Sequence, residues 1–71
     1  MSRMIRVYGP DGTLLAEEIA KSNAKRFSVR AHADQRQLDD LAKRHPKAVR
    51  GSIGTWPFVI VDGRSQSTGV V

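Results

Sequence analysis

The sequence has no cysteine, few aromatic residues and no long apolar run. The absence of Cys among 71 residues excludes disulfide bonds and zinc–thiolate sites. No apolar run approaches the ~18 residues that cross a membrane, and the amino terminus MSRMIRVYG lacks the apolar region of a secretory signal. We therefore expect a cytoplasmic protein with no membrane partner.

Acidic residues are also few, with seven Asp and Glu against twelve Lys and Arg, so the formal net charge is +5. This excess favours contact with acidic surfaces, such as nucleic acid, phosphate or an acidic face of a protein. The chain has no internal repeat, low-complexity stretch or linker, which predicts a single domain over residues 1–71. A domain this small often gains stability from a partner.

The first half of the chain begins with a short strand candidate. Residues 4–8 (MIRVY) are rich in β-branched and aromatic side chains, and the Gly-Pro-Asp-Gly turn at 9–12 ends them. From Thr13 to about Ala24 the apolar spacing predicts a helix that Thr13 caps. The alternative is a hairpin, in which residues 13–16 form a second strand and a shorter helix follows.

The second half predicts a strand, a helix and a closing hairpin. Residues 27–31 alternate apolar and polar side chains, as a strand does. Asp34 is placed to cap a helix whose apolar stripe runs from Leu38 to His45, and Pro46 marks its end. A loop over residues 47–55 then leads to the apolar run at 57–61. The Asp-Gly turn at 62–63 and a polar edge strand at 64–68 follow.

Two local motifs in this order of elements resemble a glutaredoxin. Val7-Tyr8, a Pro/Gly turn and a helix are similar to the start of that family. Thr55-Trp56-Pro57, an apolar strand and Asp62-Gly63 are similar to its Thr-Val-Pro loop and Asp-Gly hairpin. The resemblance covers about residues 4–69. It implies an α/β fold, a truncated thioredoxin/glutaredoxin-like βαβαββ with a four-stranded mixed sheet and two helices, and a cis peptide bond before Pro57.

The residues that would perform thiol chemistry are missing from this pattern. Thr13 and Ala16 occupy the two cysteine positions of the family's first helix, and a threonine hydroxyl cannot form a disulfide. The Lys before the turn and the third helix are also missing. We therefore expect a protein that is not an enzyme and that carries no cofactor, with a degenerate glutathione-binding redoxin as one alternative.

The resemblance implies a non-catalytic glutaredoxin-like binding module that docks on a larger protein. Small redoxin-like proteins are frequent in bacteriophages, so regulation of a host enzyme such as RNA polymerase is one form of this hypothesis. A ribonucleotide-reductase accessory is a rival hypothesis that the family context alone suggests. The missing third helix predicts an uncovered sheet face beside Trp56, open to a partner or to self-association. The predicted partner-binding residues are Thr13, Thr55, Trp56, Pro57 and Phe58.

A basic segment at residues 43–50 supports a second hypothesis. There Lys43, Arg44, Lys47 and Arg50 would contact an acidic surface or a nucleic acid, or would form only the solvated end of a helix. No Phe or Tyr interleaves with these cations to stack bases, which favours the solvated interpretation. The histidines match no metal-ligand spacing, so no metal site is predicted.

Overall fold

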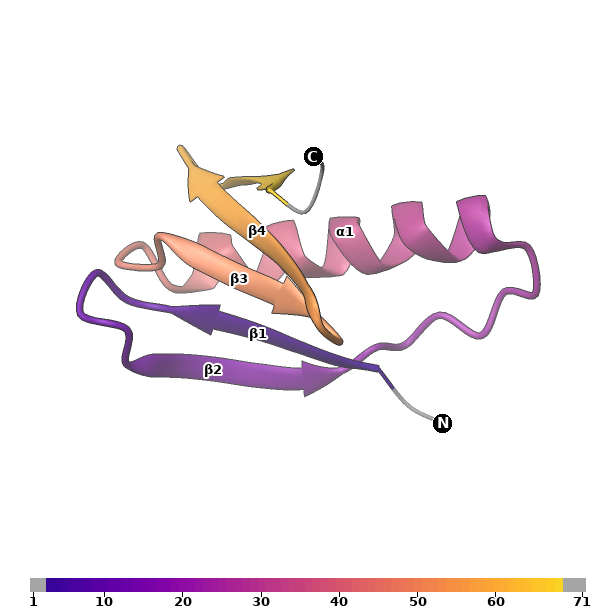
Figure 1. Cartoon of the computed structure of the whole chain (residues 1–71), viewed down its shortest axis with the longest axis horizontal. Coiled ribbons are helices and arrows are strands. Elements are labelled where there is room, and N and C mark those ends of the chain that lie inside the picture. Colours follow the sequence, from indigo (N-terminus) through magenta and orange to yellow (C-terminus); the bar gives the residue numbers. More distant parts are fainter. Residues whose placement is uncertain (1–2, 69–71) are drawn as a thin grey trace.

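The structure is a computed structural model, and it describes residues 3–68 (Figure 1). These residues form five strands and one helix. In chain order the elements are β1 (Met4–Tyr8), β2 (Leu14–Ile19), α1 (Phe27–Arg44), β3 (Arg50–Ile53), β4 (Trp56–Val61) and β5 (Arg64–Ser67).

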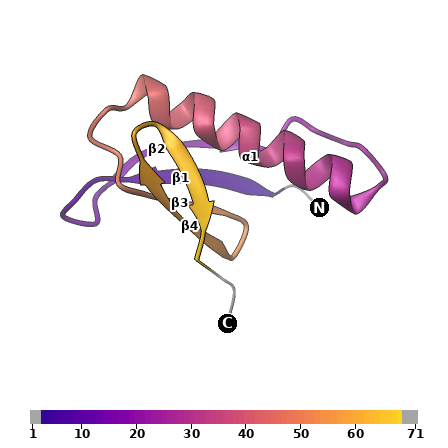
Figure 2. The ribbon, with the colours of Figure 1, turned by 90° about the horizontal axis from the view of Figure 1, so that it is seen from above.

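The strands make one antiparallel sheet in the order β2-β1-β3-β4-β5. The helix α1 lies along one face of this sheet, as the two views of the ribbon show (Figures 1 and 2). The prediction of a thioredoxin-like βαβαββ fold with two helices and a mixed four-stranded sheet is therefore wrong. The single-domain prediction for residues 1–71 is not tested by this arrangement.

The turn at residues 9–13 reverses the chain, and this reversal explains why no helix begins at Thr13. Gly9 N donates to Thr13 O at 2.9 Å, and Thr13 N donates to the Asp11 carboxylate at 3.0 Å. The chain is thus directed back along β1, and Leu14–Ile19 pairs with it as β2. The hairpin alternative is confirmed, but its second strand runs to Ile19 and the shorter helix expected directly after it is wrong, because the next helix begins at Phe27. The helix predicted from Thr13 to about Ala24 is wrong.

The helix α1 starts earlier than the sequence pattern indicates. It spans residues 27–44, so the strand predicted at 27–31 is wrong, and so is the cap predicted at Asp34, which lies inside the helix and pairs with Arg3. The helical stripe after Asp34 and the end of the helix before Pro46 are confirmed. The buried residues of α1 are Asp34, Leu38, Leu41 and Ala42. Their i, i+4, i+7, i+8 spacing places them on one face, which packs on the sheet.

The strand β3 occupies part of the segment predicted as loop. Its sequence, RGSI, has a glycine where α1 crosses most closely. A Cβ atom on Gly51 would lie 2.8 Å from Leu38 Cδ1 and 2.9 Å from the Arg6 carbonyl oxygen. Glycine at this position therefore lets the helix approach the sheet, as close backbone contacts often require.

The hairpin of β4 and β5 agrees with the sequence. Asp62 and Gly63 both have positive φ values, 53° and 75°, as a type I′ hairpin turn requires. Within residues 3–68 no peptide bond is cis, so the predicted cis bond before Pro57 is wrong. Pro57 instead lies inside β4, on the face away from α1, where it pairs with Ser52.

The hydrophobic core lies between α1 and one face of the sheet. Its buried apolar residues are Ile5, Val7, Leu38, Leu41, Ala42, Ala48, Phe58 and Ile60. The opposite face carries alternate residues such as Arg6, Tyr8, Arg50 and Val59, and no other element of residues 3–68 lies over it. The uncovered face was predicted beside Trp56 because a third helix is missing, but Trp56 lies on the side of the sheet that α1 covers, and the open face is the opposite one.

A polar cluster fastens β2 to the helix. Gln37 Nε2 donates to Glu18 Oε1 at 3.1 Å, and Arg44 Nη2 lies 2.9 Å from Glu18 Oε2. The hydrogen bond from Gln37 and then the contact with Arg44 lower the pKa of Glu18 below its ordinary value. A carboxylate whose pKa is lower in the folded state stabilises the fold above its unfolded pKa.

We expect Glu18→Gln to cost stability near pH 7 and to cost less in acid. The contribution of Glu18 is lost as the pH falls from the ordinary range of a glutamate, about 4, through the lower folded-state pKa. Urea unfolding of both proteins at about pH 7 and about pH 3 measures the difference. Glu17→Gln is the control, because it removes an exposed carboxylate whose ion pair with Arg6 lies in solvent and should contribute little. An equal effect of Glu18→Gln at both pH values would contradict this role.

Candidate functional site: an aromatic cleft

A cleft of about 430 Å³ opens between the first half of α1 and the strands β3, β4 and β5. Its volume falls in the range of about 300–1,000 Å³ that ligand pockets occupy. Most of its surface is apolar. The cleft is lined by Arg3, Phe27, Arg30, Ala31, Asp34, Gln35, Ile53, Trp56, Phe58 and Ser67.

Two aromatic side chains at this cleft are exposed to solvent. Phe27, the first residue of α1, is 74% exposed, and Trp56, the first residue of β4, is 49% exposed. Large exposed aromatics cost hydrophobic free energy unless a partner covers them, and they are enriched where proteins bind ligands. Ile53 and Phe58 add apolar surface between them. The cleft therefore combines two exposed aromatic rings, Phe27 and Trp56, with an apolar floor formed by Ile53 and Phe58.

Each exposed ring has a polar neighbour. The Arg30 guanidinium lies over the Phe27 ring at 5.5 Å from its centroid, in the range of a cation–π contact. The indole Nε1 of Trp56 donates to Ser67 Oγ, which ties the ring to β5. Arg30 thus covers part of one face of the Phe27 ring, and the exposed remainder of both rings is available for binding.

Part-buried polar contacts fix one wall of the cleft. Arg3 Nε donates to Asp34 Oδ2 at 2.6 Å, and Arg3 Nη2 donates to Asp34 Oδ1 at 3.1 Å and to the Ser22 carbonyl oxygen at 3.0 Å. Asp34 is buried, and its hydrogen bond raises the pKa of Arg3 above its ordinary value. The two-pronged pair holds the amino end of β1 against α1. The cleft is therefore built on a rigid wall.

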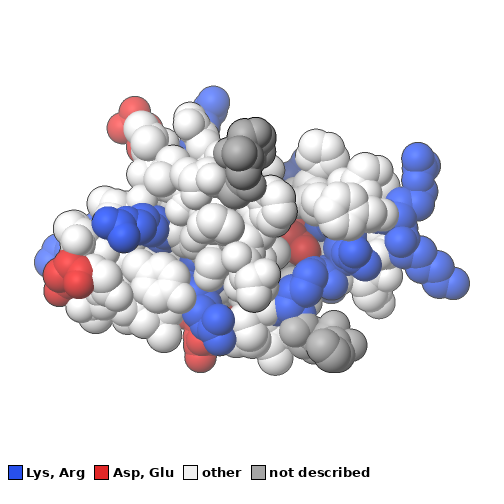
Figure 3. All heavy atoms as spheres, in the orientation of Figure 1, with Lys and Arg blue, Asp and Glu red and all other residues white. Residues whose placement is uncertain are grey.

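Cations without an acidic partner lie at the start of α1, next to the cleft residue Phe27. Within residues 3–68 the ion pairs engage Arg3, Arg6 and Arg44, whereas Lys25, Arg26 and Arg30 have no acidic partner. No acidic side chain lies in the first turn of α1 to offset them. Figure 3 shows Lys and Arg side chains gathered at the right-hand end of the molecule, where α1 begins. The region is thus both aromatic and positively charged.

The structure separates the five predicted partner-binding residues. Trp56 and Phe58 both line the cleft, and Phe58 is buried in its floor. Pro57 points to the opposite face of the sheet, and Thr55 lies in the turn before β4. Thr13 lies in the β1–β2 turn, at the other end of the strands from Trp56. The cleft therefore unites two of the five.

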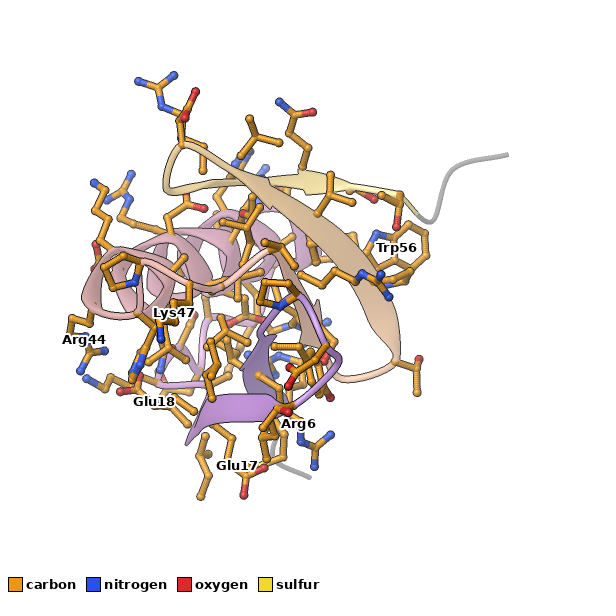
Figure 4. The ribbon with its side chains drawn as sticks, turned by 90° about the vertical axis from the view of Figure 1, so that its left-hand side faces the viewer. Arg6, Glu17, Glu18, Arg44, Lys47 and Trp56 are labelled. Atoms are coloured by element: carbon orange, nitrogen blue, oxygen red, sulfur yellow. The ribbon has the colours of Figure 1, made fainter. Side chains whose placement is uncertain are left out.

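The basic segment at residues 43–50 does not form a single surface. Arg44 is paired with Glu18, and Lys43 lies by the β4–β5 turn. Lys47 follows the helix, while Arg50 lies on the sheet face away from α1, beside Tyr8 and Val59. Figure 4 shows Arg44 and Lys47 on the opposite side of the molecule from Trp56. These cations therefore lie away from the cleft.

Sequence reasoning missed the part of the cleft that α1 contributes. Phe27 and Arg30 were placed in a predicted strand, and Lys25 and Arg26 were not considered. The signal was nevertheless present, because residues 25–30 (KRFSVR) interleave an aromatic ring with three cations. That is the combination typical of single-stranded nucleic-acid binding, which the segment at 43–50 lacks.

The described residues contain no group of three or more His, Asp or Glu side chains that could hold a metal ion. No helix within residues 3–68 is long and apolar enough to cross a membrane. Comparisons of the chain with protein-family models, with curated proteins and with solved structures gave no match.

Proposed function

We propose that this protein is a binding module that holds single-stranded nucleic acid at its aromatic cleft. The observation that carries the proposal is the presence of two exposed rings, Phe27 and Trp56, beside three cations without acidic partners. Bases of any sequence stack on aromatic side chains, while a basic groove follows the phosphates. The net charge of +5 supports the encounter with a polyanion.

Each group has a defined part in this proposal. Trp56 and Phe27 supply the faces on which bases stack, and Arg30 extends the Phe27 platform with its guanidinium plane. Lys25 and Arg26 neutralise phosphates at the open end of the cleft. Arg3 and Asp34 contact no base in this scheme, and their pairing keeps the wall in place.

The single tryptophan provides the assay. We expect the fluorescence of Trp56 to be quenched when a short oligouridylate or oligothymidylate is titrated into the protein, and the affinity to fall linearly on a log–log plot against salt concentration. Stacking on one aromatic ring is worth about 1–3 kcal/mol, so Phe27→Ala is expected to weaken binding about tenfold. Anisotropy of a labelled oligonucleotide gives the same affinity for variants that lack Trp56.

Matched double variants test the location. Lys25→Ala/Arg26→Ala and Lys43→Ala/Lys47→Ala each remove two positive charges, from different parts of the molecule. We expect the first pair to weaken binding and to reduce the salt slope by more than the second pair does. Equal losses in both pairs would contradict a cleft-centred site. No quenching and no anisotropy change at low salt would contradict nucleic-acid binding altogether.

A second candidate is docking on an acidic protein segment, with a hydrophobic side chain seated in the same cleft. The apolar floor of Ile53 and Phe58 favours it, and Trp56 would then be the anchor of the interface. This candidate keeps the idea of a module that docks on a larger protein, without a glutaredoxin fold. It becomes the preferred function if oligonucleotides fail to bind and an acidic peptide with a central aromatic residue quenches Trp56.

A further inference from the structure

The two edge strands of the sheet differ in how many of their outward backbone groups are hydrogen-bonded by the rest of the chain. In the order β2-β1-β3-β4-β5, the strands β2 and β5 each have only one neighbour (Figure 1). An edge strand presents backbone N–H and C=O groups that another strand can bond, so proteins usually cover or guard such edges. The hydrogen bonds at the two edges therefore indicate which one is available.

The helix protects the outer edge of β5 at Ser65. Thr68 N donates to Pro57 O, so in the alternation of an antiparallel pair Ser65 turns its backbone groups away from β4. Asp39 Oδ1 accepts from Ser65 N at 2.8 Å and from Ser65 Oγ at 2.6 Å. Gln35 Nε2 donates to the Ser65 carbonyl oxygen at 3.0 Å. The outward groups of this residue are thus already satisfied.

The outer edge of β2 is open at its centre. Ala20 N donates to Arg3 O at 2.8 Å, so in the register of the pair Ala16 and Glu18 bond to β1. The N–H and C=O of Glu17 therefore point away from the sheet, and no group of residues 3–68 bonds them. Gln37 satisfies only the end of the strand, through the Ile19 carbonyl oxygen at 3.1 Å and Lys21 N at 2.9 Å.

The side chains of β2 guard this edge only through two glutamates that are already paired with arginines. The strand reads LLAEEI and contains neither the lysine nor the proline that edge strands commonly use against pairing. Leu14 is 45% exposed and Ile19 is 58% exposed. Glu17 and Glu18 are each paired with an arginine, Arg6 and Arg44, so the strand has little net charge. The edge is open, partly apolar and electrically balanced.

We propose that a second copy of this chain pairs with the β2 edge, antiparallel to it, and joins two five-stranded sheets into one. A twofold axis brings the β2 edges of the two copies together. The open N–H and C=O of Glu17 in one copy then bond to the C=O and N–H of Glu17 in the other copy. The exposed apolar side chains of Leu14 and Ile19 lie at the two ends of this strand, so part of the seam is apolar. Two molecules of net charge +5 repel, and the paired Glu17 and Glu18 keep the β2 edge from adding to this repulsion.

This pairing leaves the aromatic cleft free. Trp56, Phe58 and Ser67 of the cleft belong to β4 and β5, on the opposite side of the strand order from β2. The dimer therefore carries two separate clefts. It also extends the buried surface of a domain close to the size limit for independent folding. The dimer does not depend on what the cleft binds.

Proline at residue 17 tests the proposal directly. Because Glu17 N–H faces outward, Glu17→Pro removes that donor and blocks a docking strand without breaking a bond to β1. Glu17→Thr is the matched control, since it also loses the ion pair with Arg6 but keeps the N–H. A second pair is Ile19→Lys, which puts a charge on the seam, against Ile19→Thr, which does not.

The readout is the molar mass from sedimentation equilibrium over a range of concentrations, with far-UV circular dichroism to verify folding. We expect dimers for the unaltered chain, Glu17→Thr and Ile19→Thr, and folded monomers for Glu17→Pro and Ile19→Lys. The Ile19 pair decides the question if Glu17→Pro fails to fold. A monomer of the unaltered chain at all concentrations, or an undiminished dimer of Ile19→Lys, would overturn the proposal.

Discussion

Leu38→Ala is expected to destabilise the protein by about 2–5 kcal/mol, the range found when a buried leucine is truncated. Leu38 is fully buried in the middle of α1, and its Cδ1 atom packs against Gly51 of β3. At ~0.05–0.15 kcal/mol per residue, a chain of 71 residues has a total stability of only about 4–10 kcal/mol. The variant is therefore expected to be partly unfolded at room temperature. Urea unfolding followed by circular dichroism measures the loss.

Val29→Ala is the control on the same helix. Val29 is 48% exposed, so the same kind of truncation there should change the free energy of unfolding by no more than about 0.5 kcal/mol. If Leu38→Ala proved as mild as Val29→Ala, α1 would not pack on the sheet through Leu38. The placement of Phe27 and Arg30 at the cleft would then also lose its support.

The parts of the fold predicted correctly are those that local chemistry determines. The Asp62-Gly63 pair strongly favours a two-residue hairpin, and the apolar run before it has no competing helical spacing. The second half of α1 was also predicted, because Leu38, Leu41 and Ala42 form a stripe that ends near Pro46. In both places the residues that decide the structure are close together in the sequence.

The errors occur where contacts with residues distant in the sequence determine the secondary structure. Leu15, Ala16 and Ile19 fit a helical stripe, yet β1 supplies the ladder that makes them an edge strand. The first turns of α1 show no apolar stripe because Phe27 and Val29 face solvent rather than the sheet. The spacing of apolar residues indicates a helix only where one face of that helix is buried. A helical turn that is exposed on all sides therefore shows no such spacing.

The strand β3 illustrates the same limit most clearly. Arg50–Ile53 has weak β propensity, and its glycine indicates a loop when considered alone. Its role becomes clear only when Leu38 and the Arg6 carbonyl are placed next to Gly51. The prediction of the site depended on the prediction of the fold. Trp56 and Phe58 were predicted as binding residues. Phe27 and Arg30 were not, because the helix was not predicted to start at residue 27.

Asp39→Ala is expected to cost about 2–4 kcal/mol, although Asp39 lies in neither the core nor the cleft. Its Oδ1 atom accepts from both the backbone N–H and the hydroxyl of Ser65, a residue that is only 6% exposed. Removing the acceptor leaves buried donors without partners, and each such donor costs about 1–3 kcal/mol. Urea unfolding measures the loss.

Asp39→Asn tests whether the hydrogen bonds to Ser65, rather than the charge of the side chain, account for the loss of stability. An asparagine keeps an acceptor oxygen at the same position, so this variant is expected to retain most of the stability that Asp39→Ala loses. Asp40→Ala, at an exposed neighbour with no hydrogen bond to β5, should have little effect. Equal losses for Asp39→Ala and Asp40→Ala would show that the contact with Ser65 does not stabilise the fold.

The same variant would also change how the sheet presents its edges. With Asp39 removed, the outward N–H of Ser65 is free to bond another strand, so β5 becomes a second open edge. Two open edges allow chains to add at both sides, and we expect Asp39→Ala to form open-ended assemblies where the unaltered chain stops at a dimer. Sedimentation velocity distinguishes these states. If Asp39→Ala remained of fixed size, Asp39 would contribute to stability alone, and the protection of β5 would rest on Gln35.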